Sequence, residues 1–303
     1  MPDLVAQVIR RTKGFYYLRD ETGLEVECKA KGALFKDSKY DNQIAVGDRV
    51  FYQIEPEAKL GLITRIEPRK SFLSRNRVGI EAEQIIAANL DILFICVAAK
   101  DPEPRPGLIW RMLTAANRGN LRAVLILTKT DLIHGHTHIP TLKPFENLDL
   151  EILHSSKGGG RDDNRLVELL ETHTSVLSGP SGVGKSSLIN RLFPGKNIKV
   201  GEVGKHTGKG THTTTYAQMY QIGKSGQLID TPGIREFALW DTDRTALKDH
   251  FPLIRRYGGQ CKHSDCTHSH EPHCKVKEEV ALELLDPQLY QAYLDLLAGL
   301  ERD

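Results

Sequence analysis

A glycine-rich turn between a short apolar strand and a helix restricts the fold of this chain more than any other feature of its sequence. The strand covers residues 175–177, the turn reads Gly-Pro-Ser-Gly-Val-Gly-Lys-Ser at residues 179–186, and an amphipathic helix follows from Ser187. Glycines leave room for a phosphate among the backbone N–H groups of such a turn, and the helix N-terminus adds partial positive charge. The pattern therefore predicts a phosphate-binding loop, but it leaves the nucleotide undetermined.

Two side chains of this loop have expected roles of their own. The Lys185 ammonium is expected to reach the β- and γ-phosphates, and the Ser186 hydroxyl is expected to ligate Mg²⁺. The loop residues predicted to bind the nucleotide are Gly179, Pro180, Ser181, Gly182, Val183, Gly184, Lys185, Ser186 and Ser187.

Composition and charge place the chain among ordinary globular proteins. Its 303 residues, 40% hydrophobic and 26% charged, are enough for two or three domains. The longest apolar run, residues 92–99, is far too short to span a membrane, and the first residues lead into no apolar signal segment, so a cytoplasmic location without membrane association is expected. The net charge of +2 does not indicate nucleic-acid binding by itself, so any such site has to be a local patch.

Residues 1–70 have the pattern of short strands separated by turns. Strand patterns cover residues 4–10, 15–19, 24–30, 48–54 and 61–67. Five strands in so short a segment predict a small closed β-barrel of the oligonucleotide-binding type (OB-fold), although an SH3-like barrel has a similar pattern. Residues 61–80 carry five basic residues against one acidic residue, which indicates either a contact with a phosphate backbone or a solvated linker.

Residues 71–239 alternate between strand and helix patterns. Helices are expected at 81–89, 106–117 and 165–172, and strands at 91–99, 122–127 and 151–154, before the phosphate loop. This alternation predicts an α/β domain whose parallel sheet is covered on both faces. After the loop, the polar residues 196–215 are expected to be mobile, and residues 215–222 and 226–229 are expected to form paired strands.

Asp230-Thr-Pro-Gly follows the last of these strands, about forty-five residues after Lys185. In enzymes with a phosphate-binding loop, an Asp at a strand end holds the Mg²⁺ shell, and a Gly N–H can contact the γ-phosphate. The spacing from the phosphate loop therefore assigns these roles to Asp230 and Gly233.

Two further loops have the residues expected around a purine base. Thr128-Lys129-Thr130-Asp131 resembles the Asn-Lys-x-Asp motif of guanine-nucleotide-binding proteins, with Thr128 in place of Asn. The Asp131 carboxylate can accept two hydrogen bonds from guanine N1–H and its exocyclic amine, whereas adenine offers no such pair of donors. A second loop, which resembles the segment that supports the base, has the residues Ser155, Ser156 and Lys157.

The order of these motifs along the chain is itself informative. Ras-like GTPases have the phosphate loop first and the base-reading motifs last, whereas here the base-reading loops come first. The α/β domain is therefore expected to be circularly permuted, which a compact domain tolerates when its termini lie close together.

A cysteine cluster near the C-terminus indicates a metal site. The spacing Cys-x₄-Cys-x-His-x₅-Cys predicts a closed tetrahedral zinc site, and closed sites are structural. Its expected ligands are Cys261, Cys266, His268 and Cys274, with His263, His270 and His273 as possible replacements for the imidazole. Residues 240–303 are thus expected to form a mainly helical zinc-binding domain with a final helix at about 282–300, while Cys28 and Cys96 are expected to be buried core thiols.

Together the barrel, the permuted motif order, the Gly-Lys-Gly-Thr-His-Thr-Thr-Thr segment at residues 208–215 and the Cys/His spacing resemble the bacterial ribosome small subunit-dependent GTPase A family. The resemblance covers essentially the whole chain. It implies a GTP hydrolase that acts as a late assembly factor, binds the immature small ribosomal subunit through its rRNA, and departs after hydrolysis. A monomer is the expected state. The resemblance also implies that His212 takes part in hydrolysis.

A physical argument supports the assignment of His212. Ras-like enzymes orient the attacking water with a Gln directly after Asp-x-x-Gly, but Ile234 occupies that position here and cannot bind water. His212 adjoins Thr213 and Thr214, one of which is expected to complete the Mg²⁺ shell, so its imidazole can approach the γ-phosphate. The alternative for His212 is a solvated surface residue.

Two other functional classes share parts of this pattern. Nucleoside monophosphate kinases also have Gly-Pro-Ser-Gly-x-Gly-Lys loops, but they place the loop near the start of a domain, whereas a base-reading loop precedes it here. A nucleic-acid-binding module with a non-catalytic nucleotide switch is the third possibility.

Overall fold

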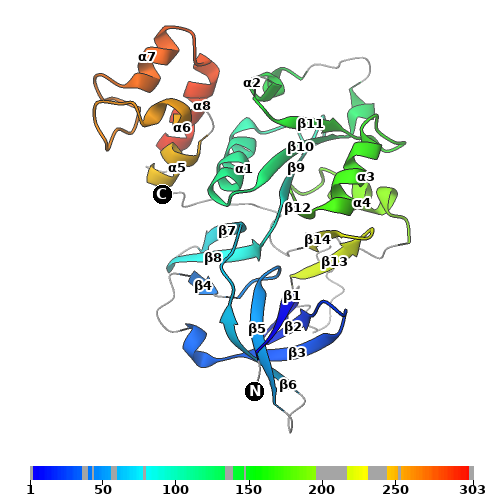
Figure 1. Ribbon diagram of the computed structural model, residues 1–303. Coiled ribbons are helices and arrows are strands. Elements are labelled where there is room, and N and C mark those ends of the chain that lie inside the picture. The colour runs from blue at the N-terminus through cyan, green and yellow to red at the C-terminus, as the bar shows by residue number, and fades with distance from the viewer. Residues whose placement is uncertain are drawn as a thin grey trace, which may run out of the picture.

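The computed structural model describes residues 3–35, 40–42, 44–55, 60–77, 80–133, 139–146, 148–195, 217–230, 244–251 and 254–299. Three parts follow one another along the chain (Figure 1): an N-terminal barrel, a helix-covered sheet and a lobe of helices that lies beside helix α1 (Pro106–Arg118). Within the described residues, no helix is both long and apolar enough to cross a membrane.

The barrel contains five strands, and its topology decides between the two barrel types. Hydrogen bonding runs in the order β1-β2-β3-β6-β5 and returns to β1, with β3 and β6 parallel. β5 and β6, the fourth and fifth barrel strands along the chain, therefore exchange places around the ring, as in a Greek-key OB-fold. This topology confirms the predicted OB-fold. The interior is apolar, and Val8, Leu18, Cys28, Val50 and Ile63 are fully buried. The strands are β1 (Leu4–Thr12), β2 (Phe15–Arg19), β3 (Glu25–Ala30), β5 (Arg49–Glu55) and β6 (Leu60–Ile66).

A small second sheet follows the barrel and corrects one prediction. It contains β4 (Tyr40–Asn42), β7 (Phe72–Arg77) and β8 (Ile80–Ala88), in the order β4-β8-β7. The helix expected at residues 81–89 is therefore wrong. Glu and Ala favour a helix locally, but the antiparallel pairing of β8 with β7 and the alternate burial of Ile85 and Ala87 outweigh that preference.

The central sheet has the predicted parallel core. Its strands are ordered β11-β10-β9-β12-β14-β13, and in this part of the sheet only β13 is antiparallel to its neighbour β14. Every residue of β9 is buried, because Leu93, Ile95 and Val97 face one apolar cluster while Phe94 and Cys96 face the other. These strands are β9 (Ile92–Ala98), β10 (Arg122–Thr128), β11 (Glu151–His154), β12 (Thr174–Ser178), β13 (Gln218–Ile222) and β14 (Gly226–Asp230).

Helices cover both faces of this sheet, as expected. α1 (Pro106–Arg118) packs in one apolar cluster, while α3 (Asp163–Thr172) and α4 (Lys185–Leu192) pack in the other; a short α2 (Lys143–Glu146) follows β10. The loops with the predicted nucleotide motifs leave the carboxyl ends of β10, β11, β12 and β14, and parallel strands bring these ends to one edge.

The barrel and the central sheet form one hydrogen-bonded ladder. β1 pairs antiparallel with β13, and the N–H of Arg11 donates to the carbonyl of Ala217 at 3.2 Å. The side chain of Gln227 on β14 also reaches Gln7 at 3.1 Å. The β13–β14 hairpin, which ends at Asp230, is therefore in direct contact with the barrel.

The C-terminal lobe packs on α1 through aromatic side chains. The ring of Trp110 on α1 contacts Phe251 of the lobe at a centroid distance of 4.9 Å, and Phe251 meets Tyr293 at 5.4 Å. Phe145 of α2 lies against the same Trp110 ring at 4.4 Å. The final helix begins at Pro287 rather than near 282, because Asp286 caps it by accepting the N–H of Gln288. The lobe contains α5 (Arg244–His250), α6 (Ile254–Gly258), α7 (Lys275–Ala281) and α8 (Pro287–Gly299).

Candidate nucleotide site and metal site

The phosphate loop connects the end of β12 to the start of α4. Gly179, Gly182 and Gly184 have positive φ angles of 151°, 79° and 99°. At Gly179 a Cβ atom would lie 2.1 Å from the carbonyl oxygen of Cys96 on the neighbouring strand, so no larger residue fits there. The turn is thus held by close contact with the sheet, and α4 begins at Lys185 with its N-terminus at the loop.

The side chain of Lys185 lies back across this loop. Its Nζ donates to the carbonyl oxygens of Gly179 at 2.7 Å and Pro180 at 2.8 Å. The ammonium is therefore positioned beside the turn where the phosphates are predicted to bind. Because a phosphate is a stronger acceptor for an ammonium than a carbonyl, these contacts can be exchanged for the ligand.

A cavity of about 510 Å³ adjoins the loop and brings the predicted base-binding residues together. Its walls come from the loops after β10 and β11 and from the phosphate loop with α4. The lining residues are Thr128, Lys129, Asp131, Leu132, Ser155, Ser156, Lys157, Val183, Gly184, Ser187, Leu188 and Arg191. All six residues predicted to bind the base thus line one cavity, together with three residues predicted from the phosphate loop.

Backbone and hydroxyl contacts connect these loops to one another. The hydroxyl of Thr128 lies within hydrogen-bonding distance of the carbonyls of Val97 and Val183, so it links the base-reading loop to the phosphate loop. The residue that departs from the Asn-Lys-x-Asp pattern therefore still makes a structural contact. On the other side of the cavity, Asp131 Oδ1 accepts the N–H of Lys157 at 3.2 Å, which joins the two base loops.

Sequence reasoning missed three residues that line the cavity. Leu132 and Leu188 form an apolar part of the cavity wall. Leu188 lies in the first turn of the helix that follows the phosphate loop, and this position in the sequence could have predicted it. Arg191 gave no such signal, because its partners come from distant segments: it pairs with both carboxylate oxygens of Asp163 and donates to Ser155.

The predicted Mg²⁺ residues lie only partly in the described chain. Asp230 ends β14, whose Ile229 is in register with Val176 of β12, so the carboxylate lies on the strand next to the phosphate loop and at the same edge. Ser186 follows Lys185 in the first turn of α4, beside the phosphate loop. Four further residues predicted to act on Mg²⁺ or the γ-phosphate lie outside the described residues: His212, Thr213, Thr214 and Gly233.

The three cysteines and His268 converge in the C-terminal lobe. Their ligand atoms all lie within 4.8 Å of one another. His268 Nδ1 is 3.4 Å from Cys261 Sγ and 3.5 Å from Cys274 Sγ, and the latter two sulfurs are 3.9 Å apart. A tetrahedral zinc ion with ordinary bond lengths requires about 3.6 Å and about 3.8 Å for these separations. The donor set therefore fits zinc, and His268 is the imidazole of the cluster.

The surrounding side chains support this arrangement. The hydroxyls of Tyr290 and Tyr293 on α8 donate to the carbonyls of His268 and Thr267, each at 2.7 Å. Burial raises the pKa of the Cys266 thiol to about 12.

Comparison with known proteins gives a consistent result. A family model described as RsgA GTPase matches residues 66–240. The small ribosomal subunit biogenesis GTPase RsgA of Chlorobaculum parvum is 36% identical, over 99% of this chain and all of that protein. The RsgA 2 protein of Bacteroides thetaiotaomicron is 34% identical over 97% and 96% of the two chains.

Solved structures agree with these relatives. The crystal structure of YjeQ from Thermotoga maritima superimposes with a TM-score of 0.72 at 27% identity and covers 99% of both chains. YloQ, described as a circularly permuted GTPase, gives 0.70 at 24% identity over 99% of this chain and 96% of its own, which bears on the fold alone and confirms the permutation expected from the motif order. This chain therefore belongs to the RsgA GTPase family, whose members hydrolyse GTP.

Proposed function

We propose that this GTPase acts late in the assembly of the small ribosomal subunit, binds the subunit and its rRNA when loaded with GTP, and leaves after hydrolysis. The observation that carries the nucleotide part is the cavity of about 510 Å³, where both base loops meet the phosphate loop. The ribosomal part rests on the relatives, which are named small ribosomal subunit biogenesis GTPases and match almost the full chain. Neither a kinase nor a non-catalytic switch is favoured by these observations.

Guanine recognition is assigned to Asp131. Its carboxylate lines the cavity and is the group there that can accept both guanine donors. Thr128 and Lys129, with the loop of Ser155, Ser156 and Lys157, are assigned to hold the base in place.

The metal ions have separate proposed roles. Ser186 and Asp230, with Thr213 or Thr214, are assigned to the Mg²⁺ that accompanies GTP, and the cation would offset charge on the phosphates. One structural zinc per chain is assigned to the Cys/His cluster, whose geometry supports it. We further infer a cytoplasmic monomer with domains at residues 1–70, 71–239 and 240–303.

We assign to His212 the role of orienting the water molecule that attacks the γ-phosphate. The small subunit is assigned as the partner that accelerates this hydrolysis. The lysines of the polar loop, at 196, 199, 205 and 209, would contact rRNA together with the barrel and the zinc segment. Docking would order this loop and bring His212 to the water.

The test is single-turnover GTP hydrolysis by the wild-type protein and His212→Ala, each with and without small subunits. The proposal requires a large acceleration by the subunit that His212→Ala loses while GTP affinity is kept. Equal stimulation of both proteins would assign the catalytic role elsewhere, and no stimulation of the wild-type protein would remove the ribosomal activator.

A further inference from the structure

We propose that Arg191 is a positioning residue for guanine selectivity: it fixes the base-supporting loop, residues 155–157, against the phosphate-binding helix α4. This inference rests on the proposed function, because it concerns the same nucleotide cavity. It goes further by assigning part of the selectivity to a residue outside the predicted motifs.

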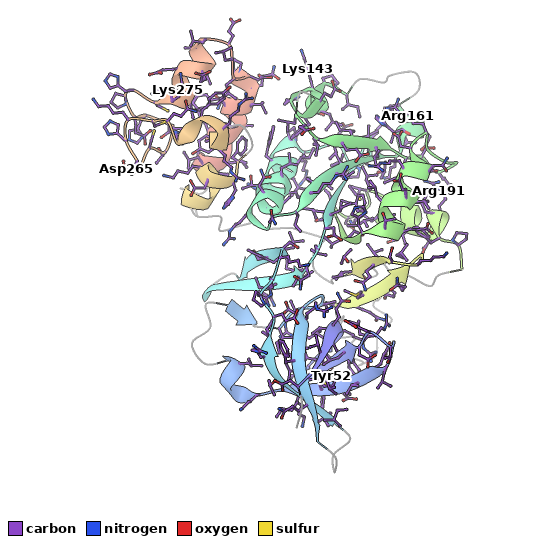
Figure 2. All side chains as sticks on the ribbon, viewed as in Figure 1. Tyr52, Lys143, Arg161, Arg191, Asp265 and Lys275 are labelled. Carbon is purple, nitrogen blue, oxygen red and sulfur yellow. The ribbon has the colours of Figure 1, made fainter. Side chains whose placement is uncertain are left out.

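Arg191 joins three segments that are far apart in the sequence. It lies on α4, on the face of the sheet that α3 and α4 cover (Figure 2). Its two terminal nitrogens bind the two carboxylate oxygens of Asp163 at the start of α3, one of them at 2.9 Å. One of these nitrogens also donates to the hydroxyl oxygen of Ser155 at 2.7 Å. The same carboxylate accepts the N–H of Gly160, so the whole segment between β11 and α3 is tied to α4.

The pairing excludes the simplest alternative, in which Arg191 is a spare cation for phosphate. The guanidinium is neutralised by a two-pronged contact with Asp163, and the side chains of the pair are only 24% and 20% exposed. The hydrogen bond from Arg191 is the main cause that lowers the pKa of Asp163, so the pair stays ionised at neutral pH. A planar fork can bind both oxygens and a third acceptor at once, whereas a lysine ammonium provides a single point charge.

The contact continues from Ser155 to the residue that reads the base. The carbonyl of Ser155 accepts the N–H of Thr130 at 3.3 Å and its hydroxyl at 3.2 Å, and Thr130 directly precedes Asp131. Arg191 is therefore connected through Ser155 to the base-reading loop. Loss of Arg191 would allow the base-supporting loop to shift relative to the phosphate loop, which is held independently by Gly179 against Cys96. The base-reading loop keeps its own contact with the phosphate loop through Thr128, but it would lose a fixed partner in Ser155.

The test compares GDP and ADP affinities by competition titration in the full-length protein. Arg191→Met is expected to lower GDP affinity about tenfold, equivalent to about 1.4 kcal/mol, and to leave ADP affinity unchanged, so the GDP/ADP ratio falls. Arg191→Lys should restore only part of the ratio, because lysine cannot reproduce the fork.

Arg165→Met is the matched control. Arg165 lies on α3, pairs with Glu151 and Glu168 at 2.9 Å, and does not line the cavity. The substitution removes the same charge from a neighbouring ion pair, and the variant is expected to keep the wild-type ratio of GDP to ADP affinity.

Each result decides the matter. If the wild-type protein does not prefer GDP to ADP, the proposed GTP function fails. If it does, and Arg191→Met keeps the ratio or loses both affinities equally, the positioning role is overturned. Should Arg191→Met not fold, Ser155→Ala removes only the hydroxyl that Arg191 binds, and an unchanged ratio in that variant would equally overturn the proposal.

Discussion

The phosphate loop and the Cys/His cluster both hold polar groups in fixed positions, but by different means. The phosphate loop is attached to buried strands, and its first glycine lies against the backbone of β9. The cluster lies among the short helices α6 and α7, of five and seven residues, where thiol and imidazole groups occupy the centre. Helices of that length are not stable alone. Packing thus preorganises the first site, whereas the proposed zinc would hold the second together.

The α/β domain with the phosphate loop and the lobe with the Cys/His cluster share an apolar cluster that includes an aromatic contact. Trp110 belongs to the helix that covers the sheet, and Phe251 belongs to the lobe; their ring centroids are 4.9 Å apart. The lobe shares the apolar cluster on the α1 face of the sheet, whereas the cluster on the α3 and α4 face contains no described residue of the lobe. Removal of the ion should therefore affect one region far more than the other.

Metal removal should have the largest effect. Chelation is expected to unfold the C-terminal lobe, because binding of a structural zinc contributes on the order of 10 kcal/mol to folding. Nucleotide binding should persist, because the cavity residues come from the sheet and its loops. Elemental analysis before chelation should give about one zinc per chain, and limited proteolysis should report the unfolding. If the metal-free lobe resists protease, the lobe does not depend on the ion, and the contrast between the two sites is wrong.

Truncation of the shared aromatic contact should come next. Phe251→Ala is expected to cost about 3–5 kcal/mol, because Phe251 is fully buried between Trp110 and Tyr293. Urea unfolding followed by protease sensitivity of the lobe would measure the change. Tyr293→Phe is the milder control, since it removes only the hydroxyl bond to Thr267, worth about 1 kcal/mol. Equal losses in both variants would mean that ring packing does not hold the lobe.

Lys185→Ala tests the preorganised site. Loss of the ammonium should weaken GTP binding about a hundredfold, or about 3 kcal/mol, because it removes charge-assisted bonds to the phosphates. Zinc content should be unchanged. Ser186→Ala should chiefly weaken the Mg²⁺-dependent part of binding. Lys143→Ala, on the short helix α2, is the control and should bind GTP as the wild-type protein does. Undiminished affinity in Lys185→Ala would refute the phosphate assignment.

Asp131→Asn should have the smallest effect and the most specific one. The variant should lose about 1–2 kcal/mol of GTP affinity and gain affinity for xanthosine triphosphate, whose extra carbonyl reverses one hydrogen bond. Equilibrium titration with both nucleotides measures the exchange. If the variant keeps its preference for GTP, the base is read elsewhere in the cavity.

Local patterns in the sequence determined the chemistry of both sites. The turn at residues 179–186, the base loops at Thr128–Asp131 and Ser155–Lys157, and the cysteine spacing each lie within a short segment, where backbone and ligand geometry demand particular residue types. Order along the chain was sufficient to predict the permutation. The positive φ angles of the loop glycines follow from the same local requirement.

Only the tertiary structure decided the features that depend on distant partners. β8 is a strand because it pairs with β7, against its own helix preference, and His268 rather than another histidine meets the cysteines because α8 holds its carbonyl. Arg191 and Asp163 are 28 residues apart and belong to no shared motif. Their contact forms only when α3 and α4 pack on the same face of the sheet. Tertiary packing brings the two residues together, and the spacing of residues within either helix does not predict it.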